Sequence, residues 1–103
     1  MKLTELNPRW VFSGGEGISN ADGSPVPRRD GVGVSFDCPC GCDRPGFIPF
    51  TNPLDGGPPI HRVTWQRTGD TFETLTLTPS IQRAEADGCR WHGYITNGEV
   101  VGA

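Results

Sequence analysis

The chain has 103 residues, enough for one domain with a small core, and only 34% of them are hydrophobic. Its formal net charge of -3 excludes a broadly basic surface of the kind that binds nucleic acid through phosphate contacts. No apolar run reaches 18 residues and the N-terminus lacks an apolar leader, so we expect no membrane contact and a cytoplasmic location. Because disulfides are disfavoured in that compartment, the four cysteines favour metal binding.

Alternation of apolar and polar residues recurs along the chain, whereas helical periodicity does not, and this predicts a mostly β, antiparallel fold. The expected strands, in chain order, are residues 10–12, 32–36, 47–50, 61–67, 71–78, 93–96 and 99–101. A hairpin turn is expected at residues 68–70. Asn97-Gly98 predicts a type I′ turn, because both residues tolerate positive φ.

The segments between these strands are rich in Gly, Pro, Asn and Asp. Residues 14–30 and 51–59 therefore predict long loops. Residues 79–87 predict one or two helical turns that begin near Pro79 or Ser80. We expect no nucleophilic role for Ser80, because the sequence shows no His–Asp partner for it, and we expect no catalytic residue.

Two compact clusters of metal-ligating residues lie far apart in the sequence. The strand at 32–36 runs into Cys38, Cys40 and Cys42, which share its parity and so one nominal face. After 46 further residues come Cys89 and His92. Paired clusters of this kind are typical of structural zinc sites, in which four ligands form a tetrahedron. Five candidates compete for four positions, and the sequence leaves open which of them is spare.

Zn²⁺ is the preferred cofactor because a small core gains most from a metal staple. Structural zinc contributes about 10–16 kcal/mol in small zinc domains. The alternatives are an iron–sulfur cluster held by three cysteines and a histidine, disulfides, and a catalytic zinc with an open coordination position.

A second group of candidates consists of arginines and a tryptophan. Eight of the nine basic residues are arginine, and Arg28 and Arg29 lie in a Pro-rich loop. Arg62 and Arg67 flank Trp65 in sequence, and an exposed Trp65 beside them would form a recognition surface, because Trp and Arg dominate binding hot spots. The alternative for Trp65 is burial in the core.

The order of three motifs resembles that of a known family. CPCGC (residues 38–42), Pro79-Ser80-Ile81, and Cys89 with His92 ahead of an Asn-Gly turn are similar to motifs in a family of small uncharacterised proteins from tailed bacteriophages and bacterial operons. The resemblance covers about residues 34–101. It implies a metal site and no particular activity.

Taken together, the sequence predicts a single zinc-binding β domain over residues 1–103, zinc-ribbon-like and stabilised by one metal site. The expected function is that of a phage-type, zinc-stabilised binding protein. It would act by protein–protein interaction in the host cytoplasm, as a host-factor or anti-defence accessory, or as a virion component. The alternatives are a small zinc-dependent hydrolase and a zinc-ribbon-like nucleic-acid-binding module, the latter disfavoured by the acidic charge.

Overall fold

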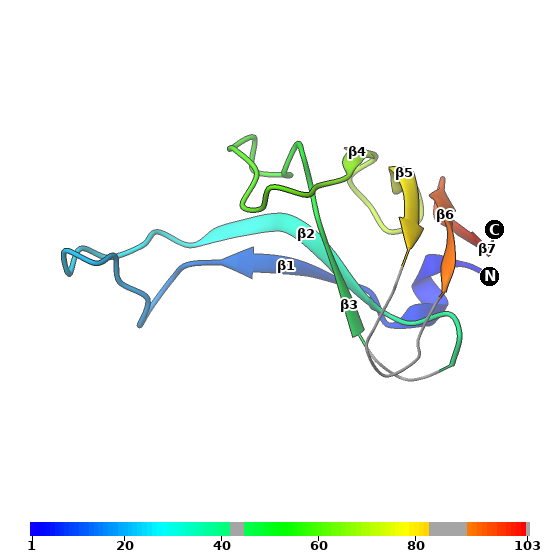
Figure 1. The fold of residues 1–103 in the computed structure, drawn as a ribbon, viewed down its shortest axis with the longest axis horizontal. Helices are drawn as coiled ribbons and strands as arrows, with labels where there is room; N and C mark the ends of the chain where they lie inside the picture. The colour runs from blue at the N-terminus through cyan, green and yellow to red at the C-terminus, as the bar shows by residue number, and fades with distance from the viewer. Residues whose placement is uncertain (42–44, 83–90, 103) are drawn as a thin grey trace.

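The computed structural model describes residues 1–41, 45–82 and 91–102. The described residues form a short 3-10 helix and antiparallel strands arranged in two sheets (Figure 1). The elements are η1 (Leu3–Leu6), β1 (Arg9–Ser13), β2 (Arg29–Asp37), β3 (Pro45–Pro49), β4 (Gln66–Thr68), β5 (Thr76–Gln82), β6 (His92–Thr96) and β7 (Glu99–Gly102). One sheet has the order β1-β2-β3 and the other the order β4-β5-β6-β7.

The β1–β2 hairpin is long and projects away from the four-stranded sheet, as Figure 1 shows. Its register shifts between Val11 and Phe12, whose partners are Gly33 and Asp30. Gly31 lies in this irregularity with φ +73°, and a Cβ there would come within 2.6 Å of the Cβ of Leu54. The glycine therefore permits both the bulge and the close approach of the residue 54 loop.

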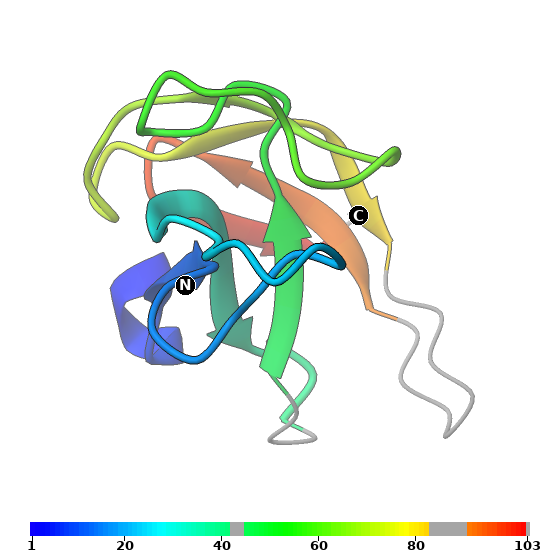
Figure 2. The ribbon, with the colours of Figure 1, turned by 90° about the vertical axis from the view of Figure 1, so that its left-hand side faces the viewer.

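One apolar core joins the two sheets. In Figure 2 strands β1–β3 lie in front of β5–β7, and the core contains residues from both sets. Its buried members are Leu3, Leu6, Val34, Phe36, Ile48, Phe50, Leu75, Leu77, Ile81, Ile95 and Val100. Trp10, Trp65, Phe72 and Trp91 pack against it while partly buried. Because each sheet covers the apolar face of the other, even a chain with few hydrophobic residues excludes water from its centre.

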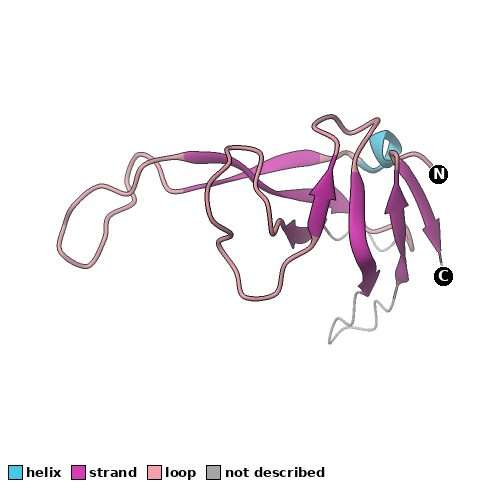
Figure 3. Ribbon diagram, turned by 90° about the horizontal axis from the view of Figure 1, so that it is seen from above, coloured by secondary structure: helices cyan, strands magenta, loops and turns pink. Residues whose placement is uncertain are grey.

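The C-terminal ribbon and the N-terminus lie side by side (Figure 3). Asn97 (φ 48°) and Gly98 (φ 76°) form the turn between β6 and β7, which confirms the expected positive-φ pair. The N–H of Val100 donates to the carbonyl of Met1 at 2.7 Å, so the first residues of the chain extend the sheet beyond β7. The free edge of β7 is thereby partly covered.

The mostly β, antiparallel fold is confirmed, but four expectations were wrong. The strand expected at 71–78 begins only at Thr76, and residues 72–74 form a turn. β4 is shorter than the strand expected at 61–67 and begins only at Gln66. The helical turns expected at 79–87 were wrong for residues 79–82, because these residues belong to β5, which ends at Gln82. The rest of that segment lies outside the described residues. The zinc-ribbon-like architecture is not supported, because the described strands form two sheets around an apolar core. Among the described residues no helix is long and apolar enough to cross a membrane.

Candidate functional site

Ser80 and His92 come together because β5 pairs with β6. Ile81 lies opposite Gly93, and Gln82 lies opposite His92. This register brings His92 beside Ser80, although the two residues are twelve positions apart in the sequence. The Nε2 atom of His92 lies 2.9 Å from the Oγ atom of Ser80. His92 is exposed and Ser80 half-buried, which leaves the pair accessible from solvent. A hydroxyl at hydrogen-bond distance from an imidazole can transfer its proton to the ring and become a nucleophile.

β5 has a register shift next to Ser80. Leu77 pairs with Ile95, but the next pair is Ile81 with Gly93, so residues 78–80 lie opposite Tyr94 alone. Bulges of this kind occur beside active sites, where they redirect a side chain without ending the strand. Pro79 fits in this stretch because proline lacks the N–H that a regular ladder would need. Ser80 is the last residue of this irregular stretch, and its hydroxyl contacts His92 on β6.

Trp65 fixes the backbone of Ser80. Its indole Nε1 donates a hydrogen bond to the Ser80 carbonyl at 3.2 Å. The backbone of Trp65 is itself held at both ends, because its N–H donates to the carbonyl of Pro49 at 2.9 Å and its carbonyl accepts from the N–H of Thr51 at 2.9 Å. Trp65 therefore connects the edge of the three-stranded sheet to the serine on the four-stranded sheet.

The surroundings of His92 are aromatic. The rings of His92 and Tyr94 lie 6.2 Å apart between centroids, on the outward-facing positions of β6. Gly93 between them faces the core, where a Cβ would come within 2.4 Å of the Trp91 ring. Within the described part of the chain no carboxylate is hydrogen-bonded to His92, so the site is described as a serine–histidine dyad. Dyads and other variants of the serine–histidine–aspartate arrangement recur on unrelated folds.

The expected metal ligands are only partly described. Cys38 is buried after β2, and its Sγ lies at 3.1 Å from the Sγ of the exposed Cys40, in a hydrogen bond. Cys42 and Cys89 lie outside the described residues. In the described ranges no group of three or more His, Cys, Asp or Glu side chains is arranged to hold a metal. Zinc and the iron–sulfur alternative stay predictions. The fifth expected ligand, His92, contacts the Ser80 hydroxyl through its Nε2 atom.

Three of the four arginines expected to form a recognition surface make contacts of their own. Arg29 binds Asp55 through two hydrogen bonds, and Arg28 binds Asp30 and stacks on Phe12. The guanidinium of Arg67 donates to the carbonyls of Asn52 and Gly69. Arg62 is exposed in the connection between β3 and β4.

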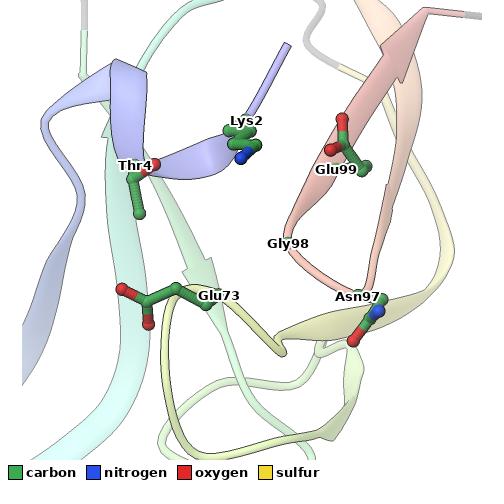
Figure 4. Close-up of a pocket in the computed structure, with 6 residues that line it drawn as sticks. All are labelled: Lys2, Thr4, Glu73, Asn97, Gly98 and Glu99. Atoms are coloured by element: carbon green, nitrogen blue, oxygen red, sulfur yellow. The ribbon is translucent and has the colours of Figure 1, made fainter.

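Two hollows in the described structure lie away from the dyad. One, of about 220 Å³, lies at the Asn97-Gly98 turn, at the far end of β6 from His92 (Figure 4). It is lined by Lys2, Thr4, Glu73, Asn97, Gly98 and Glu99. The other, of about 300 Å³, is lined by Trp10, Asp30, Gly31, Leu54 and Asp55. Neither of these two hollows contains Ser80 or His92.

The fold and the dyad together define an all-β protein with a site of the serine-hydrolase type. Residues 19–103 match the model of the BubE family, described as a bacterial ubiquitination-like system serine protease. The chain belongs to this family. Comparison with curated proteins and comparison with solved structures give no match.

This family overturns the function expected from the sequence. A phage-type zinc-stabilised interaction protein was the wrong prediction, because the family is bacterial and is named for a serine protease. The zinc-dependent hydrolase shared only the hydrolytic class, and the nucleic-acid-binding module does not agree with the family either. The expectation that Ser80 has no histidine partner was also wrong.

Proposed function

We propose that this protein is a serine protease of a bacterial ubiquitination-like system, with Ser80 as the nucleophile and His92 as the general base. The observation that carries the proposal is the 2.9 Å contact between Ser80 Oγ and His92 Nε2. The family description supplies the class of reaction and the setting. The proposal replaces the metal-centred expectation and needs no metal in the chemical step.

In the first half-reaction, Ser80 Oγ attacks the carbonyl carbon of the scissile bond while His92 Nε2 accepts the hydroxyl proton. This role requires the histidine tautomer that carries its proton on Nδ1. His92 then donates the proton from Nε2 to the leaving amine, and an ester forms between Ser80 and the acyl part of the substrate. Trp65 holds the Ser80 backbone in place during the attack.

In the second half-reaction, His92 Nε2 takes a proton from water, and the resulting hydroxide attacks the ester carbonyl. The ester bond breaks, the proton returns to Ser80 Oγ and the carboxylic acid leaves. The exposure of His92 and the half-burial of Ser80 suit a polypeptide substrate that lies across the sheet.

A chromogenic ester tests the proposal without knowledge of the natural substrate. We expect the protein to hydrolyse p-nitrophenyl acetate, and Ser80→Ala to lower the rate by at least about 100-fold, since nucleophile and base act as a unit. Ser19→Ala is the matched control, because Ser19 is exposed in the loop between β1 and β2. Equal rates for the wild type and Ser80→Ala would reject Ser80 as the nucleophile.

A further inference from the structure

An apolar patch lies beside the dyad on the outer face of the four-stranded sheet. Tyr94 and Val101 are directly paired across β6 and β7. Their exposed fractions are 48% and 55%, although both are large hydrophobic residues. Paired side chains on one face of a sheet stand about 4.5–5.5 Å apart, so the two form one continuous apolar surface. We call it the Tyr94–Val101 patch.

The patch is continuous with the reacting atoms. Tyr94 lies opposite the three-residue stretch of β5 that ends in Ser80, and its ring lies 6.2 Å from that of His92. A substrate carbonyl attacked by Ser80 must therefore lie over the sheet face next to Tyr94. The leaving nitrogen must face His92, because His92 protonates it. The side chain on the acyl side of the scissile bond is then the substrate group nearest to the patch.

We infer that the Tyr94–Val101 patch is the subsite for an apolar side chain at the residue whose carbonyl Ser80 attacks. The inference rests on the proposed function and adds the specificity of the same site. The patch itself carries no charge, and burial of apolar surface is favourable while burial of an unpaired charge is costly. An apolar residue at this position is favoured over an acidic one.

Two other exposed aromatic residues, Phe12 and Phe47, do not offer an equivalent surface. Phe12 is covered by the guanidinium of Arg28, whose Cζ lies 4.1 Å from the ring centroid. Phe47 packs edge-on against His61, with ring centroids 5.6 Å apart. Neither residue contacts Ser80 or His92, whereas the Tyr94–Val101 patch adjoins both.

Peptidyl diphenyl phosphonates test the subsite, because they phosphonylate the active serine at a rate that depends on the side chain next to phosphorus. We expect the wild type to react at least about 10-fold faster with a leucine side chain than with a glutamate side chain, as expected for an apolar subsite. Val101→Asp should abolish this preference and raise the rate with a lysine side chain. Ile18→Asp, in the distant β1–β2 loop, should keep the wild-type preference.

Two further variants test whether the Tyr94 ring and the apolar Val101 side chain form the subsite. Tyr94→Phe should keep the leucine preference, because the ring and not the hydroxyl forms the subsite; a fall in the rate with every reagent would overturn this role. Val101→Thr changes the patch with little effect on shape and should weaken the preference. An unchanged preference in Val101→Asp, or self-association of the wild type that Val101→Asp abolishes, would reject the subsite.

Diisopropyl fluorophosphate tests the proposed function separately from the subsite, because this reagent carries no amino-acid side chain. Reaction at Ser80 in every patch variant, together with a lost leucine preference, supports both proposals. Reaction at Ser80 with an unaltered preference rejects the subsite alone. No reaction at Ser80 in the wild type rejects the proposed function.

Discussion

At the scale of single residues, the dyad depends on a contact between Ser80 and His92 that no local sequence motif predicts. Ser80 and His92 are separated by twelve positions, and only the pairing of β5 with β6 shows that they face each other. The sequence also favoured a helix from Pro79, and in a helix Ser80 would have no cross-strand neighbour. The sequence selected His92 as a candidate site residue and, because cysteines lie nearby, predicted it as a metal ligand; the structure adds its contact with the Ser80 hydroxyl.

An ion pair with two hydrogen bonds joins Arg29 to Asp55. The Nε and Nη2 atoms of Arg29 donate to the two carboxylate oxygens at 2.7 and 3.0 Å. The N–H of Gly57 donates to the same carboxylate at 2.9 Å. These bonds, that of Arg29 first, lower the pKa of Asp55 from 3.8 to about 2. The contact ties the loop after β3 to the start of β2.

The pKa of Asp55 predicts an acid-dependent contribution to stability. Because the folded-state pKa is lower than the unfolded-state value, the stabilisation is complete above about pH 4 and is lost as pH falls toward about 2. We expect Asp55→Asn to lower the free energy of unfolding at pH 7. Urea denaturation should show this difference from the wild type shrinking between pH 4 and pH 2. A difference that is independent of pH would contradict the assignment.

At the scale of elements, the sequence predicted most strands and the Asn97-Gly98 turn, because alternation and turn chemistry are local signals. It did not predict the irregular course of β5, because a register shift depends on which residues of β6 lie opposite. It also did not predict that Trp65, which directly precedes β4, reaches Ser80 on β5, since that contact depends on the register between these two strands. Both features lie at Ser80, the proposed nucleophile.

Trp65→Phe tests the hydrogen bond that holds the Ser80 carbonyl. The substitution keeps an aromatic ring but removes the indole N–H. We expect a loss of about 0.5–1.5 kcal/mol in the free energy of unfolding, together with slower ester hydrolysis at saturating substrate. Trp10→Phe is the control, because Trp10 packs on Phe72 away from Ser80 and should leave the rate unchanged. Equal rates in the two variants would mean that the Trp65 bond does not position the serine.

A substitution at Gly93 tests the packing on the core side of β6, beneath the dyad. A Cβ at this position would lie 2.3 Å from the carbonyl oxygen of Val101 and 2.4 Å from the Trp91 ring. We therefore expect Gly93→Ala to destabilise the protein by about 1–3 kcal/mol through overpacking. Gly102, its partner across β6 and β7, is the matched control, since a Cβ there would come no closer than 3.9 Å to Trp91. Similar thermal unfolding of both variants would contradict the packing described here.

At the scale of the whole molecule, two sheets share one apolar core, and the serine–histidine pair lies on the outward face of one of them. Composition indicated a thin core and therefore a metal staple, but composition does not show that the two sheets bury their apolar faces against each other. Residues 1–18 precede the family match, yet they provide β1 and the segment that pairs with β7.

The most direct test of the account is covalent modification by diisopropyl fluorophosphate. In this reaction Ser80 Oγ forms a bond to phosphorus, fluoride leaves and His92 takes up the hydroxyl proton. We predict one diisopropylphosphoryl group per chain, located on Ser80 by peptide mass mapping, with much slower labelling in His92→Ala and unchanged labelling in His61→Ala. Labelling at another residue, or equal labelling of the two histidine variants, would contradict the serine–histidine dyad.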